Sequence, residues 1–151
     1  PVKTDINALI DGCVNFFSGH EQVGFHTEID SRIPEIYIDK NLMKQTLNNL
    51  IQNAIDAVGK TGNIYITSRL VAGEGIDLAR ITIRDDGIGI MERDREKIFN
   101  PGFSTKSTGT GLGLAIVEKI IMEHKGEISC NSEYGKGTEF VIDLPIISEG
   151  T

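Results

Sequence analysis

The sequence contains no tryptophan, only two cysteines and no apolar run that approaches the length of a transmembrane helix. Cys13 and Cys130 lack the spacing of a disulfide framework, which is typical of reduced thiols in a cytosolic protein, and no signal peptide opens the chain. Cationic residues are scarce, because 15 Lys and Arg face 22 Asp and Glu, for a net charge of −7. We therefore expect no nucleic-acid partner and no direct contact with a membrane.

The periodicity of apolar residues predicts one compact domain of helices and strands. The elements do not alternate as regular βαβ units, which favours an α+β fold: a two-layer sandwich in which one mixed sheet is covered on one face by helices. Helices are expected over residues 5–17, 39–58, 92–98 and 112–124, and strands over 23–30, 36–38 (a short continuation of the preceding strand), 64–71, 78–84, 126–132 and 138–144.

The helix predicted over residues 39–58 carries a line of polar side chains opposite its apolar stripe. Gln45, Asn49, Asn53 and Asp56 are spaced so that they share one helix face, and Asn48 lies nearby. Asparagine is a poor helix former, because its side chain competes for backbone hydrogen bonds. The pattern indicates a polar site, and an ordinary solvated face is the alternative.

The strand predicted over residues 78–84 runs into the sequence DDGIG. Ile83 and Asp85 fall on one face of a period-two strand, which places the Asp85 carboxylate at the edge of the core. An unpaired carboxylate is costly there, so Asp85 is expected to accept a hydrogen bond from a specific donor, such as the exocyclic amine of adenine. Gly87 and Gly89 would let a flat base approach the backbone. A β-turn marked by Asp-Gly is the alternative.

Three alternating glycines, Gly109, Gly111 and Gly113, precede the last predicted helix. Free N–H groups and the positive end of a helix dipole suit phosphate groups, and Lys106 would add a cation. The loop matches neither a Walker loop nor a dinucleotide-binding fingerprint, and a flexible connection is the alternative.

Thr138 opens a strand whose other inward residues are apolar. A hydroxyl at the start of a buried strand face indicates the rim of a polar pocket. A core threonine whose hydroxyl is satisfied by the protein itself is the alternative.

Together, five segments resemble, in order, the nucleotide-binding motifs of the GHKL superfamily (gyrase, Hsp90, histidine kinases and MutL). The similarity covers about residues 35 to 145 and is greatest to the catalytic domain of sensor histidine kinases, especially the nitrogen-regulation type. The motifs are LNNLIQNAIDA (47–57), DDGIGI (85–90), IFNPGFSTK (98–106), GTGLGLAIV (109–117) and GKGTEF (135–140).

This resemblance implies the Bergerat fold with a flexible ATP lid over residues 99–111, anchored by Phe99 and Phe103. Asn53 would place its amide oxygen on Mg²⁺, and Asp85 would bind the adenine amine, partly through water held by Thr138. The ATP-binding residues implied are Asn49, Asn53, Asp56, Asp85, Gly87, Gly89, Ile90, Lys106, Gly109, Thr110, Gly111, Leu112, Gly113, Leu114 and Thr138.

The resemblance also implies an enzyme, a protein histidine kinase in which Asn49 and Asn53 are the catalytic positions. ATP-hydrolysing relatives carry a Glu four residues before the magnesium Asn, and here that position is Asn49, which cannot accept a proton at neutral pH. We therefore expect ATP binding without a hydrolytic base, followed by transfer of the γ-phosphoryl group to a histidine that is itself the nucleophile.

We expect this histidine to lie outside the chain. His20 precedes a predicted strand rather than lying within a long helix, and His124 ends a helix, where a partial charge suits the dipole. The acceptor would be on a dimerisation domain of the same parent protein, N-terminal to Pro1, and a response regulator receiver domain would take the phosphoryl group onward. Residues 1–22 would be a helix and connection, and residues 23–151 the ATP-binding domain, within one domain overall.

Other functions remain compatible with parts of the pattern. The first alternative is an anti-sigma-factor-type serine kinase or switch on the same fold, which the phenylalanine-containing segment 98–106 disfavours. An ATP-driven clamp is disfavoured by Asn49, and a domain that binds no nucleotide would explain the glycines as turns. A cytoplasmic location is expected, with the parent protein either free or anchored in a membrane.

Overall fold

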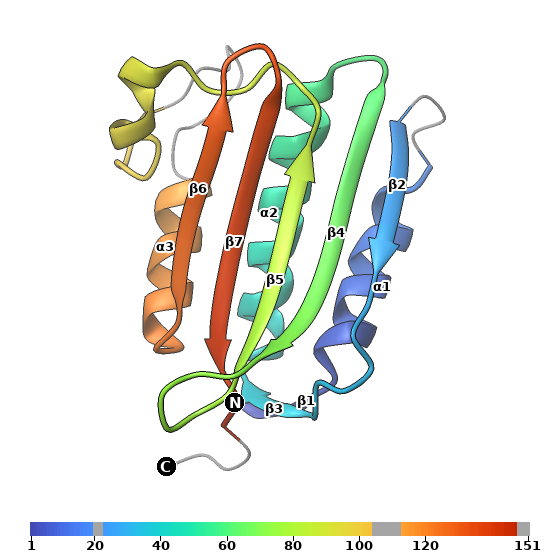
Figure 1. Ribbon diagram of the computed structural model, residues 1–151, viewed down its shortest axis with the longest axis vertical. Helices are drawn as coiled ribbons and strands as arrows, with labels where there is room; N and C mark the ends of the chain where they lie inside the picture. The colour runs from blue at the N-terminus through green and yellow to red at the C-terminus, as the bar shows by residue number, and fades with distance from the viewer. Residues whose placement is uncertain (20–22, 104–112, 148–151) are drawn as a thin grey trace.

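The computed structural model describes residues 1–19, 23–103 and 113–147, and it contains two layers: a sheet, and helices on one of its faces (Figure 1). The strands are β1 (Val2–Thr4), β2 (Val23–Glu28), β3 (Ile36–Ile38), β4 (Gly62–Val71), β5 (Leu78–Asp85), β6 (Glu127–Glu133) and β7 (Gly137–Pro145). The helices are α1 (Ile6–Phe17), α2 (Lys40–Val58), the 3-10 helix η1 (Glu92–Lys97) and α3 (Gly113–Glu123).

The main sheet has five strands in the order β2-β4-β5-β7-β6. The edge strand β2 runs parallel to β4, whereas the other neighbouring pairs are antiparallel. Helices α1, α2 and α3 cover one face (Figure 1), and the buried isoleucines of β4 and β5 face them. This arrangement confirms the predicted α+β sandwich with a mixed, mostly antiparallel sheet.

The short strand β3 corrects one expectation. Residues 36–38 were expected to continue the strand before them, but β3 leaves the main sheet and pairs antiparallel with β1 at the N-terminus. A turn at residues 31–32 and Pro34 separate β3 from β2, since proline cannot donate to a continuing ladder. The Tyr37 N–H also donates to the Ile147 carbonyl at 2.7 Å, so both ends of the described chain meet here.

Helix α1 is part of the same core as the rest of the domain. Asp5 caps it by accepting a hydrogen bond from the Ala8 N–H at 3.1 Å, and the apolar face of the helix is buried. Asp39 caps α2 in the same way through the Leu42 N–H at 3.1 Å. The buried residues of α1 are Ile6, Leu9, Ile10, Cys13, Val14 and Phe17.

His124 connects the end of α3 to the start of α2. Its Nδ1 lies 2.8 Å from the Ile120 carbonyl, which can only accept, and its Nε2 accepts the Asp39 N–H at 3.1 Å. In this arrangement Nδ1 is the donor and Nε2 is the acceptor, so the ring links the two helices by two hydrogen bonds.

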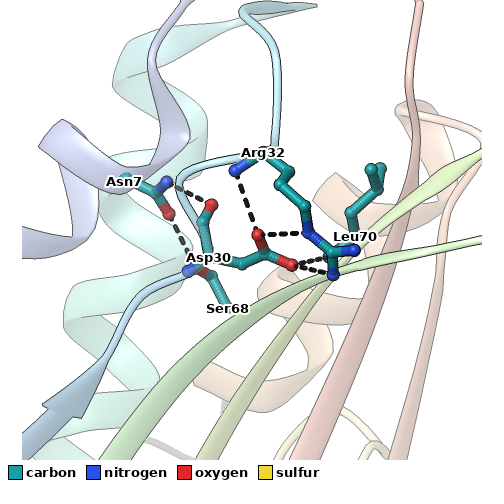
Figure 2. A network of polar contacts seen from close by, with 5 residues as sticks. All are labelled: Asn7, Asp30, Arg32, Ser68 and Leu70. Carbon is teal, nitrogen blue, oxygen red and sulfur yellow. Dashed lines mark hydrogen bonds and ion pairs between the residues drawn. The ribbon is translucent and has the colours of Figure 1, made fainter.

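A polar network ties α1 and the β2–β3 connection to β4 (Figure 2). The Asp30 carboxylate accepts two hydrogen bonds from the Arg32 guanidinium, at 2.9 and 2.7 Å, and one from the Leu70 N–H at 2.9 Å. The Asp30 N–H donates to the Ser68 hydroxyl, which in turn donates to Asn7 at 2.6 Å. Arg32 and the backbone donors hold the pKa of Asp30 well below its usual range.

The Asp30→Asn variant should therefore melt several degrees below the wild-type domain at pH 7. A carboxyl whose folded-state pKa is depressed contributes stability above its usual pKa near 3.8 and loses it as the pH falls further. The difference between the two proteins in thermal melting should shrink steadily below about pH 4. Equal melting temperatures at pH 7 would show that the network does not stabilise the fold.

Candidate functional site

The helix-facing side of the sheet changes from apolar to polar at one end. Ile83 and Phe140 oppose each other in the buried apolar part, and the next inward row holds Asp85 opposite Thr138 and Thr138 opposite Ser132. Asp85, Thr138 and Ser132 are only 5%, 6% and 8% exposed. We call these three residues the polar row. A row of buried polar groups at the end of an apolar core is a candidate ligand site.

Asp85 is the charged member of the polar row. Within the described residues it accepts hydrogen bonds from two backbone N–H groups, that of Gly87 at 2.9 Å and that of Thr138. Burial raises the pKa of this carboxyl to about 6, and the two backbone donors only partly offset that effect. A carboxylate has about four acceptor positions, so acceptor capacity remains for a ligand.

The neighbouring Asp86 has a different environment. Its two carboxylate oxygens accept from the Asn63 backbone N–H at 2.7 Å and from the Asn63 side-chain amide at 3.0 Å. The backbone hydrogen bond from Asn63 is the main reason that the pKa of Asp86 is lowered. Asp86 therefore secures the start of β4 to the end of β5, whereas Asp85 faces the helices.

The glycines of the DDGIGI segment have a structural role that the sequence interpretation did not include. A Cβ at Gly87 would lie 2.4 Å from the Ala57 carbonyl carbon and oxygen, and a Cβ at Gly89, where φ is +77°, would lie 2.3 Å from the Glu133 carbonyl oxygen. These glycines therefore admit the protein's own backbone. The Ile88 N–H donates to the Ala57 carbonyl at 3.1 Å, which fixes the turn against the end of α2.

This contact brings the polar face of α2 to the polar end of the sheet. Asn53 lies one helical turn before Ala57, and both Asn49 and Asn53 are half-buried. Asp56 is exposed and accepts a hydrogen bond from the Gln52 side chain at 3.0 Å. The structure thus places Asn53 at the same end of the domain as Asp85, and Asn49 on the same helix face one further turn back toward the middle of α2.

The last helix starts at this end as well (Figure 1). Helix α3 begins at Gly113 and packs beside α2, with Gly113 and Leu114 half-buried and Val117 in the core. Its first turn thus lies at the same end of the domain as the polar row. The other predicted phosphate-loop residues, Lys106, Gly109, Thr110, Gly111 and Leu112, lie outside the described residues.

The two predicted lid anchors contact the core. The Phe99 ring meets the Phe140 ring edge-to-face with centroids 6.4 Å apart, and Phe103 also packs against the buried cluster. The adjacent Ile98 is 4% exposed, so it is a third apolar attachment, which we had not singled out from the sequence. The segment that enters the predicted lid is therefore fixed to the body of the domain.

Ser132 is the member of the polar row that the sequence interpretation missed. Its hydroxyl accepts the Ile90 N–H at 2.7 Å, so it also holds the end of the DDGIGI segment. The signal was present in the sequence, because Ser132 lies two and four residues after Cys130 and Ile128 on β6 and therefore shares their inward face.

Comparison with known proteins connects this geometry to a family. Residues 38–148 match the family model described as histidine kinase-, DNA gyrase B- and HSP90-like ATPase, and this match includes the polar row, the asparagines of α2 and the start of α3. The chain belongs to this family. Within the described residues, no helix has the length and apolarity needed to cross a membrane.

Relatives and solved structures place the chain among histidine kinases. It is 37% identical to the sensor histidine kinase ZraS of Escherichia coli K12 over 94% of this chain and 30% of ZraS. The catalytic domain of histidine kinase ThkA matches with a TM-score of 0.84 and 35% identity, covering 97% of both chains, and ThkA has also been solved with the response regulator TrrA. Full-length ShkA in complex with AMPPNP matches with a TM-score of 0.84 and 26% identity over 99% of this chain and 32% of ShkA. The chain thus spans about a third of the length of ZraS.

Proposed function

We propose that this chain is the ATP-binding catalytic domain of a two-component sensor histidine kinase. The observation that carries the proposal is the buried Asp85 carboxylate, 5% exposed, beside a helix that presents Asn49 and Asn53. The similarity to ShkA, solved with the ATP analogue AMPPNP, supports a nucleotide at this position. Residues 23–151 would form the nucleotide-binding part, and residues 1–22 would lead in from the acceptor domain while packing α1 against the same core.

In this proposal the base is held at the polar row. The ionised Asp85 accepts a hydrogen bond from the exocyclic amine of adenine. Guanine has a carbonyl oxygen at that position, which would place two acceptors against each other with no hydrogen between them. Mispairing a buried polar group costs about 1–3 kcal/mol, which is enough to select the base. Thr138 lies directly opposite Asp85 and supplies a second oxygen to the same pocket.

The triphosphate would extend from the polar row between α2 and the start of α3. The Asn53 amide oxygen is a hard, neutral donor of the kind that Mg²⁺ accepts beside waters and phosphate oxygens, so the residues present fit the ion, which would neutralise charge on the phosphates. Backbone N–H groups at the first turn of α3 would stabilise the same charge.

The chemical step needs no base from this chain. A nitrogen of the acceptor imidazole attacks the γ-phosphorus, the bond from that phosphorus to the β–γ bridging oxygen breaks, and ADP leaves as the ring loses a proton to solvent. Asn49 occupies the position where hydrolytic relatives carry a Glu, so water in the site is not activated. The γ-phosphoryl group is therefore transferred to the histidine and not to water.

Three partners complete the proposal: MgATP, a histidine-bearing dimerisation domain of the parent protein, and a response regulator receiver domain. ThkA in complex with TrrA supports the last of these, and the cytoplasmic location follows from the need for ATP. The serine-kinase or switch alternative on the same fold is not favoured, because the matched relatives are sensor histidine kinases. No observation on the described residues favours a second function.

Phosphotransfer from this domain to a separately made helical domain of the parent protein tests the proposal. Calorimetry should first show binding of MgATP. With γ-labelled ATP, the label should then appear on the partner's histidine, where it is stable to base and labile to acid. Acid-stable label on serine, or nucleotide binding without any transfer to the histidine domain, would overturn the proposed function.

The Asn53→Ala variant should lose affinity for ATP mainly when magnesium is present. Removing an amide ligand should cost about tenfold in affinity with Mg²⁺ but little in EDTA, because only the metal-bound nucleotide uses the amide oxygen. Titration calorimetry in both buffers measures the two losses. Asn41→Ala, in the exposed first turn of the same helix, is the matched control. Equal losses in both buffers would refute the metal role of Asn53.

A further inference from the structure

The Ser132 hydroxyl joins three segments at the polar row. It accepts the Ile90 N–H at 2.7 Å, donates to the Gly137 carbonyl at 2.9 Å and lies 2.9 Å from the Thr138 hydroxyl. The Ser132 carbonyl, in addition, accepts a hydrogen bond from the Arg95 guanidinium of η1. One residue on β6 therefore holds the end of the DDGIGI segment, the start of β7 and the 3-10 helix.

Counting protons fixes the direction of the bond between the two hydroxyls. A serine hydroxyl has one hydrogen and two lone pairs. The Gly137 carbonyl can only accept, so it takes the Ser132 hydrogen, and the Ile90 N–H can only donate, so it takes one lone pair. The contact with Thr138 must therefore use the second lone pair of Ser132, which makes Thr138 the donor.

This direction determines what Thr138 offers to a ligand. Its only hydrogen is spent on Ser132, so its oxygen can only accept further hydrogen bonds. Asp85, directly opposite on β5, is likewise an acceptor once ionised. The side-chain oxygens of Asp85 and Thr138 then both act as hydrogen-bond acceptors. A ligand group or a bridging water must therefore donate a hydrogen bond to each of them.

We propose that Ser132 is a positioning residue that sets base specificity by holding the Thr138 hydroxyl as an acceptor. This inference rests on the proposed function, because it takes the polar row to be the base pocket. A free threonine hydroxyl could turn and donate to a carbonyl oxygen, which is what a 6-oxopurine presents. Ser132 removes that option, so it reinforces the preference of Asp85 for a 6-aminopurine.

The test compares the affinities for ATP and for inosine triphosphate, which carries a carbonyl in place of the amine, in wild-type and Ser132→Ala domains. The wild type should bind ATP more tightly than inosine triphosphate. In Ser132→Ala, the ratio of the affinity for ATP to the affinity for inosine triphosphate should fall about tenfold. Ser129→Ala is the matched control, because Ser129 is on the same strand but exposed, and its ratio should stay at the wild-type value. A ratio unchanged in Ser132→Ala overturns the inference.

Two further variants separate specificity from folding. Thr138→Val removes the hydroxyl that Ser132 holds, so adding Ser132→Ala to it should leave the affinity ratio unchanged. Ser132→Thr keeps the hydroxyl and should keep the wild-type ratio, including where Ser132→Ala fails to fold. If Ser132→Ala lowers the affinities for ATP and for inosine triphosphate by the same factor, Ser132 has a purely structural role and the inference is refuted. A wild-type domain that binds neither nucleotide would instead refute the proposed function.

Discussion

Replacing Asp85 with Asn should remove a loss of stability that the wild-type domain undergoes as the pH rises to neutrality and, at the same time, weaken its binding of ATP. The folded-state pKa of this carboxyl, about 6, lies above its usual 3.8, so its contribution to stability is present below pH 3.8 and lost as the pH rises through 6. A pKa difference of about 2 corresponds to about 3 kcal/mol. Asn carries no charge, so the variant avoids this loss.

Urea unfolding of both proteins between pH 3.5 and 7.5 measures this effect. The free energy of unfolding of Asp85→Asn, relative to the wild type, should rise by about 3 kcal/mol across that range, since the wild type alone must hold a buried charge. Asp143→Asn is the control, because it removes the carboxylate of a half-buried ion pair with Arg80 on the same sheet. A flat difference for Asp85→Asn would mean that Asp85 is solvated in the folded protein.

The same substitution should reduce the affinity for ATP about tenfold or more. The Gly87 and Thr138 N–H groups already donate to this side chain, and Asn offers one acceptor oxygen where Asp offers two. The wild type should also bind ATP more tightly as the pH rises through about 6, because the ionised form is the better acceptor. Titration calorimetry at pH 5 and 7.5 tests both statements. An affinity that Asp85→Asn leaves intact would remove Asp85 from the base pocket.

The Gly137→Ala variant should be the most destabilising single substitution proposed here, by about 2–4 kcal/mol. The added Cβ would lie 2.1 Å from the Asp85 carbonyl oxygen, and φ is +139°, a backbone conformation that side chains other than glycine rarely adopt. Neither the β5–β7 ladder nor the turn can relieve the overlap without moving the polar row.

Denaturant unfolding measures that loss, and a second glycine provides the control. Gly12 lies inside α1, and a Cβ there would meet nothing within 4 Å, so Gly12→Ala should stabilise the domain by up to about 1 kcal/mol. The two alanine variants should therefore move stability in opposite directions. If Gly137→Ala unfolds at the wild-type denaturant concentration, the close approach to Asp85 does not exist in solution.

The parts of the fold that follow from local patterns were predictable. The period-two alternation of β5 predicts that Asp85 faces inward, and the helical spacing of α2 predicts that Asn49 and Asn53 share one face. The β4–β5 and β6–β7 antiparallel pairs were confirmed in the same way. Each of these features is set by residues close together in sequence, whereas the parallel pair that makes the sheet mixed joins distant residues such as Val23 and Gly62.

Features that depend on distant residues were not predictable. The pairing of β1 with β3 involves two three-residue strands whose partners are more than 30 positions apart, so neither segment indicates its partner. The hydrogen bond that His124 makes to the start of α2 uses the Asp39 N–H, 85 positions away. The role of Gly87 likewise required the Ala57 carbonyl, which only the packing of α2 on the sheet brings near.

The placement of the two ends of the chain constrains how a joined domain could deliver a histidine. Strand β3 joins both β1 and Ile147 at the end of the sheet opposite the polar row (Figure 1). Most of the length of the ten-residue strand β4, roughly 30 Å, separates them from that row. A domain attached before residue 1 would therefore start on the far side of the molecule from the phosphates. In the proposed kinase, an acceptor histidine joined there would therefore have to be carried across the length of the sheet to reach the proposed phosphate site.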